Sequence, residues 1–393
     1  MDLAERVKKL SPSPTLGITA KAKKMQKEGS PVISFGAGEP DFDTPENIKL
    51  AAIDSIKSGF TKYTPSSGIE ELKEAIIEKL RKENDLYYKP SEIVVSCGAK
   101  HAIFNAIMVL CNPQDEVIII SPYWVSYEEM VKLAEGIPVI VKTNFEDKFK
   151  LNIKKLEEKI TKRTKIIILN SPSNPAGITL DEKTVKEIAR IAKENNIYVI
   201  SDEIYEKIIY DNNKNYSIAK EIRDLTILIN GVSKTYSMTG WRIGYSAAPE
   251  KISYYISNLQ DHSTSNPASI SQKAALEAIK GTQEDVKKML KEFERRRKFI
   301  VSALNEIKGI ECFLPEGAFY VFPKVSYYFG KKYNGKVIEN SLDLTEYLLI
   351  EAKVAVVPGI AFGEDNCIRL SFATSMENIK EGVKRIKETL QRL

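Results

Sequence analysis

Side chains able to do chemistry gather in one short stretch, residues 230–245, which follows an apolar run ending at Ile229. Lys234 stands there among glycines and small hydroxyl residues, directly after Ser233, and Arg242 follows in the same stretch. A lysine that leaves a buried strand loses its proton when it is desolvated or close to other cations, and its neutral amine forms Schiff bases. The stretch therefore predicts an amine nucleophile. A surface lysine beside a turn is the alternative for Lys234 taken alone.

Two other apolar runs also end in polar residues. Asp202 and Tyr205 follow the run that ends at Ile200, and Asn170 begins the proline-rich segment 170–177. A carboxylate at the end of a buried strand needs a partner or water, because an unpaired buried charge is costly. Asp202 and Tyr205 are therefore candidate site residues. A helix N-cap for Asp202 and ordinary loop chemistry for the segment 170–177 are the alternatives.

A fourth polar junction suits an anion. Gly98, Ala99 and Lys100 lead directly into an apolar helix that we expect over residues 101–110. Small residues with free backbone amides at a helix N-terminus bind phosphate groups well. An ordinary strand-to-helix turn is the alternative at this position.

Pyridoxal phosphate requires four kinds of group that these segments supply: an anion-binding helix N-terminus, an amine, a carboxylate and a phenol. Its phosphate needs amides, a hydroxyl and an arginine, and its aldehyde needs a lysine. Its ring nitrogen needs a carboxylate, and its phenolate oxygen accepts a hydrogen bond from a tyrosine. In an open parallel sheet, ligands bind beyond the carboxyl ends of the strands, which is where we expect these segments to lie. The combination therefore predicts a pyridoxal-phosphate site.

The runs that precede these segments are apolar at every position, which is typical of strands covered on both faces. Helical stripes of apolar residues are predicted between them over residues 69–80 and 184–195. This alternation predicts an α/β fold with a mostly parallel sheet flanked by helices, accompanied by a smaller α+β domain. The predicted strands are residues 92–96, 116–120, 165–169, 197–200 and 226–229.

The domain organisation is predicted from a change of pattern near residue 283. Residues 283–307 are largely polar and contain no proline, which predicts one long helix connecting two domains. Residues 46–282 are expected to form the large cofactor-binding domain. Residues 1–45 and 308–393 are expected to form the small domain together.

Composition excludes several classes of protein. The 393 residues carry 58 Lys and Arg against 53 Asp and Glu, and the resulting net charge of +5 gives no basic field for nucleic acid. No apolar stretch approaches the ~18 residues of a membrane helix, and the first ten residues lack the apolar core of a signal peptide. We therefore expect a cytoplasmic protein without a membrane or nucleic-acid partner. Four scattered cysteines and two histidines predict neither a disulfide nor a metal site.

Over essentially its whole length, the chain resembles the fold-type I pyridoxal-phosphate-dependent aminotransferases of class I/II, in particular the prokaryotic-type aspartate aminotransferases. The resemblance depends on many spaced motifs rather than on a single one. They are residues 36–45, 63–65, 98–100, 121–124, 170–175, 201–205, 233–234, 240–242 and 369–371.

The resemblance implies a catalytic role for three residues. Lys234 would hold the cofactor as a Schiff base and, once released by substrate, move the proton between the substrate Cα and the cofactor. Asp202 would pair with the pyridine nitrogen, and Tyr205 with the phenolate oxygen. Asn170 would also contact that oxygen, and Trp124 would stack on the ring and line the substrate site.

The resemblance also implies how the phosphate is held. Two backbone amides, the Ser233 hydroxyl and the Arg242 guanidinium would bind it in one subunit, and Tyr63 would reach it from a second subunit. The two amides are those of Ala99 and Lys100. A phosphate site shared in this way implies a homodimer with shared active sites.

For the substrate, the resemblance implies a carboxylate clamp made of Arg369, Asn170 and the backbone at Gly38. A planar guanidinium binds a carboxylate through two parallel hydrogen bonds. Lys100 stands where the prokaryotic-type aspartate enzymes have a lysine that meets a second carboxylate. The alternative is that Lys100 only lines the phosphate site. Because the clamp and Lys234 belong to different predicted domains, substrate binding is expected to draw the domains together.

The predicted function is transfer of the amino group from an L-amino acid, most simply aspartate, to 2-oxoglutarate by a ping-pong mechanism. An alanine, aromatic or broad-specificity aminotransferase of the same family is the alternative, followed by a pyridoxal-phosphate-dependent lyase. A nicotinamide-dependent dehydrogenase is disfavoured, because the segment beginning Gly36-Ala37-Gly38 has a proline where a Gly-x-Gly-x-x-Gly motif must start its helix.

Overall fold

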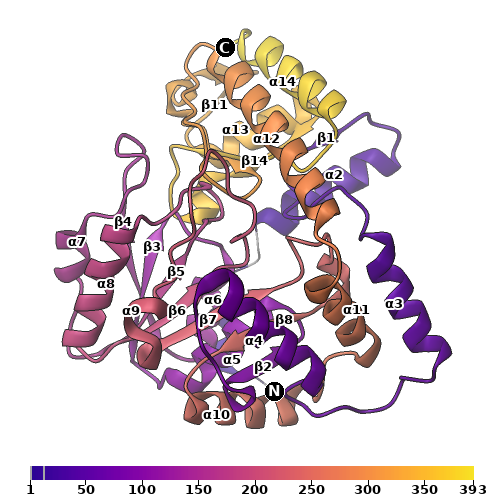
Figure 1. Ribbon diagram of the computed structural model, residues 1–393. Coiled ribbons are helices and arrows are strands. Elements are labelled where there is room, and N and C mark those ends of the chain that lie inside the picture. The colour runs from indigo at the N-terminus through magenta and orange to yellow at the C-terminus, as the bar shows by residue number, and fades with distance from the viewer. Residues whose placement is uncertain (1, 12–13) are drawn as a thin grey trace.

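The computed structural model describes residues 2–11 and 14–393, and its centre is a seven-stranded sheet of order β2-β8-β7-β6-β5-β3-β4 (Figure 1). β8 runs antiparallel to β2 and β7, whereas the other neighbouring pairs are parallel. The predicted α/β fold with a mostly parallel sheet is therefore confirmed. The strands are β2 (Ile93–Ser96), β3 (Glu116–Ser121), β4 (Ile137–Lys142), β5 (Thr164–Asn170), β6 (Tyr198–Asp202), β7 (Thr226–Gly231) and β8 (Gly244–Ala247).

Two strands of this sheet were not predicted from the sequence. β8 consists of Gly244, Tyr245, Ser246 and Ala247, which include no β-branched residue, and β4 contains Pro138. Both become strands through tertiary pairing: β8 lies between β2 and β7, and β4 pairs along the outer side of β3. Strand propensity depends strongly on such context, so the local pattern was not sufficient.

Helices cover both faces of the sheet, which explains why its strands are apolar at every position. One face packs against α5 (Ala99–Leu110), α6 (Ser126–Leu133) and α10 (Glu250–Ser263). The opposite face packs against α8 (Glu182–Glu194) and the short α7 (Ile153–Glu157) and α9 (Ala219–Ile222). Around β2 and β8, the core also includes α3 (Glu46–Lys57), α4 (Glu70–Asn84) and α11 (Ser269–Lys280).

Local sequence signals set several helix boundaries. The Asp181 side chain accepts a 2.7 Å hydrogen bond from the Thr184 amide and thereby caps α8. The apolar stripe of α8 then faces the sheet, with Val185 and Ile188 buried. α5 begins at Ala99, two residues before the predicted start, so the 98–100 junction is itself the helix N-terminus.

The C-terminal part surrounds a second core. α12 (Glu284–Asn305) is the long helix predicted from residues 283–307, and in Figure 1 it lies with α14 (Met376–Leu390) above the sheet. A small antiparallel sheet of order β13-β14-β9 packs beneath these helices. Its strands are β9 (Tyr320–Val321), β13 (Val357–Pro358) and β14 (Ile368–Ser371); the other elements of this part are α13 (Ser341–Tyr347), β10 (Lys332–Tyr333) and β11 (Lys336–Val337).

The N-terminal segment lies against this C-terminal part. β1 (Ile33–Ser34) pairs in parallel with β12 (Val354–Ala355), which is distant in sequence. α2 (Pro14–Lys27) precedes this pair, and the short α1 (Glu5–Lys8) contacts α6. The pairing brings the glycine-containing segment after β1 to the carboxyl ends of the central strands.

Within residues 2–11 and 14–393, no helix has the length and apolar character needed to cross a membrane. In the same described residues, no group of three or more His, Cys, Asp or Glu side chains is arranged to hold a metal ion.

Candidate active site

Lys234 lies just beyond β7, in the loop that the sequence singled out. Its Nζ donates a 2.8 Å hydrogen bond to the carbonyl oxygen of Gly38, in the segment that follows β1. Desolvation lowers the pKa of Lys234 to about 8, and the charges of Arg242 and Arg369 act in the same direction. The carboxylate of Glu39 opposes this shift. A lysine with such a pKa is partly neutral near neutral pH, as a nucleophile or general base must be.

Asp202 ends β6 and is 4% exposed. The phenol of Tyr127, on α6, donates a 2.6 Å hydrogen bond to Oδ2, and the amide of Ile204 donates to Oδ1 at 3.2 Å. Burial raises the pKa of Asp202 to about 6, against the lowering effect of these two hydrogen bonds and of Lys234. The group is therefore a buried carboxylate that is ionised at neutral pH and available to a cation.

Tyr205 lies in the turn after β6 and is buried. Its hydroxyl oxygen lies 2.8 Å from that of Tyr320, on β9. Burial raises the pKa of Tyr205 well above its usual value, so the phenol keeps its proton and can donate it in a hydrogen bond.

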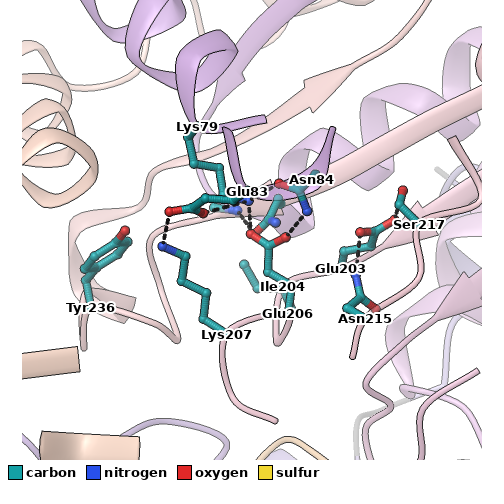
Figure 2. A network of polar contacts seen from close by, with 12 residues as sticks. Lys79, Glu83, Asn84, Glu203, Ile204, Glu206, Lys207, Asn215, Ser217 and Tyr236 are labelled. Carbon is teal, nitrogen blue, oxygen red and sulfur yellow. Dashed lines mark hydrogen bonds and ion pairs between the residues drawn. The ribbon is translucent and has the colours of Figure 1, made fainter. Parts of the chain in front are cut away.

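A polar network fixes the turn that carries Tyr205 (Figure 2). Glu206 forms a buried ion pair with Lys79 of α4 and accepts a 2.8 Å hydrogen bond from Asn84. Lys207 pairs with Glu83, also on α4, at 2.7 Å. These contacts attach the turn to α4, a helix that packs against the central sheet.

Glu203 fixes the other side of the same turn and is 1% exposed. Its Oε1 accepts hydrogen bonds from the hydroxyls of Ser201 and Ser217 at 2.9 and 2.6 Å, and its Oε2 accepts one from the Asn215 amide at 2.7 Å. Burial raises the pKa of Glu203 to about 7. This carboxyl lies next to Asp202 in sequence but binds the following loop.

The predicted phosphate-binding amides lie at the start of α5. Ala99 and Lys100 are its first two residues, and the first N–H groups of a helix have no acceptor within the helix. Arg242 approaches the same turn: its Nη2 donates to the Cys97 carbonyl at 3.3 Å, and a Cβ added to Gly98 would lie 2.3 Å from that nitrogen. Only glycine therefore allows the guanidinium to come this close to the helix N-terminus.

Lys100 and Trp124 lie next to each other. The Lys100 Nζ lies 5.0 Å from the centre of the Trp124 ring, and that ring packs edge-on against Tyr127 with 5.3 Å between centroids. Burial, followed by the charge of Arg242, lowers the pKa of Lys100. Trp124 is thus in contact both with the residue that holds Asp202 and with the start of α5.

Ser233 and Tyr63 differ sharply in exposure. Ser233 is 5% exposed, directly before Lys234, whereas the side chain of Tyr63 is 91% exposed. A single chain therefore leaves the Tyr63 ring in solvent.

Arg369, on β14, is 2% exposed. Its Nη1 donates to Asn174 Oδ1 at 2.9 Å and its Nη2 to the Gly36 carbonyl at 2.8 Å, while the Tyr320 ring lies 4.6 Å from the guanidinium carbon. Nε is buried without a hydrogen-bond partner. In the part of the chain that the structure describes, no carboxylate forms an ion pair with this guanidinium.

Asn174, rather than Asn170, lies against Arg369 in the structure, so Asn174 is a further candidate for the clamp expected from Arg369, Asn170 and the backbone at Gly38. Both ends of the Asn170 amide already have partners: Nδ2 donates to the Asp202 carbonyl on the neighbouring strand at 3.0 Å, and Oδ1 accepts from the Asn174 amide at 2.8 Å. The backbone oxygen that contacts Arg369 is that of Gly36, whereas the Gly38 oxygen accepts a hydrogen bond from Lys234. The sequence offered two asparagines in one turn and no signal to choose between them.

The sequence also missed Tyr127 and Tyr320. Tyr127 shares the buried side of α6 with Met130 and Val131, so it resembles an ordinary core residue. Tyr320 lies in the aromatic run that begins at Phe319 and has the same appearance. Only the structure shows that the Tyr127 hydroxyl contacts Asp202 and that the Tyr320 hydroxyl contacts Tyr205.

The arrangement fits pyridoxal phosphate. At the start of α5, the lack of a side chain on Gly98 leaves room for the Arg242 guanidinium beside the free helix amides, an arrangement that suits a phosphate. The buried Nε of Arg369 has no hydrogen-bond partner, which suits a carboxylate ligand. An amine of lowered pKa and a buried carboxylate complete the set of groups that this cofactor needs. Together with the fold, these groups define a fold-type I pyridoxal-phosphate enzyme.

Comparison with known proteins gives the family. Residues 30–386 match the sequence profile of the family described as "Aminotransferase class I and II". The chain is 50% identical to an aspartate aminotransferase of Bacillus sp. (strain YM-2), with 98% of each chain covered. It is 49% identical to a probable aspartate/prephenate aminotransferase of Aquifex aeolicus (strain VF5), with 100% of this chain and 99% of the relative covered.

A solved structure agrees with these relatives. The aspartate aminotransferase of Rhizobium meliloti superimposes with a TM-score of 0.96 at 43% identity, and the match covers 100% of both chains. The chain therefore belongs to the class I and II aminotransferases, which depend on pyridoxal phosphate.

Proposed function

We propose that this aminotransferase moves the amino group of L-aspartate to 2-oxoglutarate in a ping-pong cycle. The observation that carries the proposal is the buried guanidinium of Arg369, which has no carboxylate partner among the described residues and acts electrostatically on Lys234. The segment that contains Gly36 and Gly38 binds both of these cations through its carbonyl oxygens. A carboxylate held by Arg369 would thus lie close to the amine that must act on the neighbouring carbon.

When bound, the cofactor supplies an electron-withdrawing ring that stabilises negative charge at the substrate Cα, and it carries the amino group between the two half-reactions. Lys234 would hold the cofactor through its aldehyde, and its free amine would take and return the proton at the substrate Cα. Its pKa of about 8 leaves a useful neutral fraction at neutral pH. Asp202, ionised above about pH 6, would stabilise a proton on the ring nitrogen.

The remaining site residues position the cofactor and the substrate. The hydroxyl of Tyr205 would donate a hydrogen bond to the phenolate oxygen, and Trp124 would pack against the ring. Ser233, Arg242 and the first amides of α5 would hold the phosphate. Asn174 takes the place that we expected for Asn170 and orients Arg369 toward the substrate α-carboxylate.

Lys100 is proposed to bind the second carboxylate of aspartate. Its ammonium lies over the Trp124 ring, next to the residue proposed to cover the cofactor, and burial lowers its pKa. A cation in this position distinguishes dicarboxylic from neutral substrates. The alternative is that Lys100 only lines the phosphate site and that the enzyme prefers alanine or aromatic amino acids.

Prephenate is a second candidate substrate, because the relative from Aquifex aeolicus is named for aspartate and prephenate. Prephenate also carries two carboxylates, so Lys100 and Arg369 would serve both substrates. A panel of amino donors with 2-oxoglutarate or prephenate as acceptor tests both candidates. Fast amino transfer from alanine but not aspartate would refute the proposal, and loss of substrate without a keto-acid product would indicate a lyase.

A chemical experiment tests the role of Lys234. Borohydride should fix the yellow chromophore of the holoenzyme to the peptide that contains Lys234, as detected by mass spectrometry. Lys234→Ala should lose the fixed chromophore and transaminate negligibly. Normal turnover by this variant would contradict the assignment.

We further propose a homodimer that shares its active sites. α3 exposes an apolar stripe of Leu50, Ile53 and Ile56, with 41–53% exposed side chains, and Tyr63 follows this helix with its ring in solvent. Such a stripe is typical of an interaction surface. Sedimentation should give a dimer. A mixture of Tyr63→Ala and Lys234→Ala chains should regain activity, because one hybrid site has both residues intact.

Residues 46–282 and the combination of 1–45 with 308–393 are proposed as two domains that close on substrate, joined by the helix in residues 283–307. The pairing of β1 with β12 supports grouping the two chain ends. Cell fractionation is expected to place the protein in the cytoplasm.

A further inference from the structure

Strand register places Tyr320 on the same face of the small sheet as Arg369. In the pair formed by β14 and β9, Tyr320 lies opposite Ser371, two residues beyond Arg369. Directly paired residues share a face of a sheet, and so do residues two apart on one strand. The ring of Tyr320 and the guanidinium of Arg369 therefore project to the same side, with 4.6 Å between the ring centre and the guanidinium carbon.

This one side chain touches three parts of the site. In addition to the contact of its ring with Arg369, its hydroxyl oxygen lies 2.8 Å from that of Tyr205. The same oxygen lies 3.2 Å from the point where a Cβ would be if Gly38 had a side chain. Tyr320 is 0% exposed, so none of these contacts is shared with solvent. It thus joins the small antiparallel sheet to the turn after β6 and to the segment that binds Lys234.

The contact with Arg369 supports its charge without neutralising it. The guanidinium is buried, its Nε has no hydrogen-bond partner, and in the described ranges no acidic side chain pairs with it. The face of an aromatic ring attracts a cation but cannot accept its proton or occupy its fork of donors. Arg369 therefore stays charged and open to a carboxylate, whereas an acidic partner would compete with the substrate.

The contact with Tyr205 has a direction that matters. Two hydroxyls 2.8 Å apart share one proton along the line between them, and either oxygen can be the donor. In the proposed function, the Tyr205 hydroxyl donates to the phenolate oxygen of the cofactor, which uses its only proton. The Tyr205 oxygen can then only accept, so the proton between the two phenols must come from Tyr320.

We propose that Tyr320 is a positioning residue that couples the carboxylate clamp to the cofactor: its ring holds the Arg369 guanidinium, and its hydroxyl donates to Tyr205. This inference rests on the proposed roles of Tyr205 and Arg369. A donated hydrogen bond polarises the accepting phenol and strengthens its own donation, because chains of hydrogen bonds reinforce one another. Tyr320 therefore stabilises negative charge on the phenolate oxygen through Tyr205.

Two variants separate the ring from the hydroxyl. Tyr320→Phe keeps the ring over Arg369 and removes only the donor. With weaker donation from Tyr205, the phenolate is less stable and the chromophore keeps its proton to higher pH. The midpoint of the visible absorbance titration should rise by about half a pH unit or more. The affinity for succinate, an unreactive dicarboxylate, should change less than about threefold, because the cation–ring contact remains.

Tyr320→Leu removes both contacts. It should raise the titration midpoint in the same way and also weaken succinate binding by about tenfold, since the guanidinium loses its aromatic support. Both effects are measured spectroscopically on the bound cofactor, independently of turnover.

Tyr210→Phe is a matched control, because Tyr210 is also buried, lies 4.4 Å from the Arg297 guanidinium, and donates to the Ala318 carbonyl at 2.6 Å. It should lower thermal stability without moving the absorbance midpoint or the succinate affinity. If folded Tyr320→Phe and Tyr320→Leu both behave like this control, Tyr320 only fills space and the inference is overturned. A wild-type protein without the chromophore would instead refute the proposed function.

Discussion

The phenol of Tyr127 donates a 2.6 Å hydrogen bond to Oδ2 of Asp202, and both residues are buried. Tyr127 lies in α6, the helix that begins just after Trp124. Asp202 is the last residue of β6. A neutral donor stabilises the ionised carboxylate in a place where burial disfavours it. The protein thus keeps a charged acid available for the cofactor ring without adding a competing cation.

Replacing Tyr127 by Phe tests this relationship. Burial raises the pKa of Asp202 to about 6 in spite of the hydrogen bond, so removal of the bond should raise that pKa further. More of the carboxyl is then protonated near pH 6.5 and unable to pair with a ring cation. We expect cofactor affinity to fall about tenfold at pH 6.5 and much less at pH 8.5, measured by titrating the apoenzyme with pyridoxal phosphate.

Tyr123→Phe is the control for that experiment, because Tyr123 also donates a 2.6 Å hydrogen bond from a mostly buried phenol, but to Glu128. Its cofactor affinity should stay within about twofold of the wild type at both pH values. An equal loss at pH 6.5 and pH 8.5 for Tyr127→Phe would show that the bond does not act through the ionisation of Asp202.

The two asparagines of the proline-rich turn should respond differently to substitution. Asn174→Ala removes the acceptor of the Arg369 Nη1 hydrogen bond, so the KM for aspartate should rise about tenfold while the spectrum of the bound cofactor stays unchanged. Asn170→Ala removes one hydrogen bond within the turn and one to the Asp202 carbonyl on β6, and should mainly lower thermal stability. The reverse pattern, with the KM effect in Asn170→Ala, would restore the clamp that the sequence suggested.

The sequence was most informative where chemistry and strand ends coincide. Lys234, Asp202 and the 98–100 junction each follow an apolar run, and the topology of a parallel sheet brings such ends together without further information. The start of α5 was placed two residues too late because Ala99 and Lys100 carry no capping signal, although both are good helix formers.

Contacts between elements far apart in the chain could not be predicted from the sequence. In the sequence, Tyr127 and Tyr320 occupy positions typical of the apolar core. Their hydroxyls contact Asp202 and Tyr205 only because elements far apart in the sequence pack together. Arg369 was identified from a motif, but its asparagine partner depends on the path of a turn that local propensity does not specify.

Lys100 should affect substrate choice rather than general catalysis. Lys100→Ala removes the cation that lies over Trp124, so kcat/KM for aspartate should fall about tenfold or more, while the value for alanine changes little. Lys100→Arg keeps the charge and should retain part of the preference. Equal losses with aspartate and alanine would show that Lys100 serves the phosphate site and not the side chain of the substrate.

Glu203 makes stability depend on pH, and Glu203→Gln should remove that dependence. Burial raises the pKa of Glu203 from 4.5 to about 7, so the folded state prefers the protonated carboxyl. Its contribution is complete below about pH 4.5 and is lost as the pH rises through 7, a change of about 3 kcal/mol. Denaturant unfolding of the apoenzyme from pH 4.5 to 8 should therefore show the free energy of unfolding of the wild type falling relative to that of Glu203→Gln. Asp202 titrates in both proteins and cancels in the difference, so parallel curves would mean that the bonds from Ser201, Ser217 and Asn215 keep Glu203 ionised.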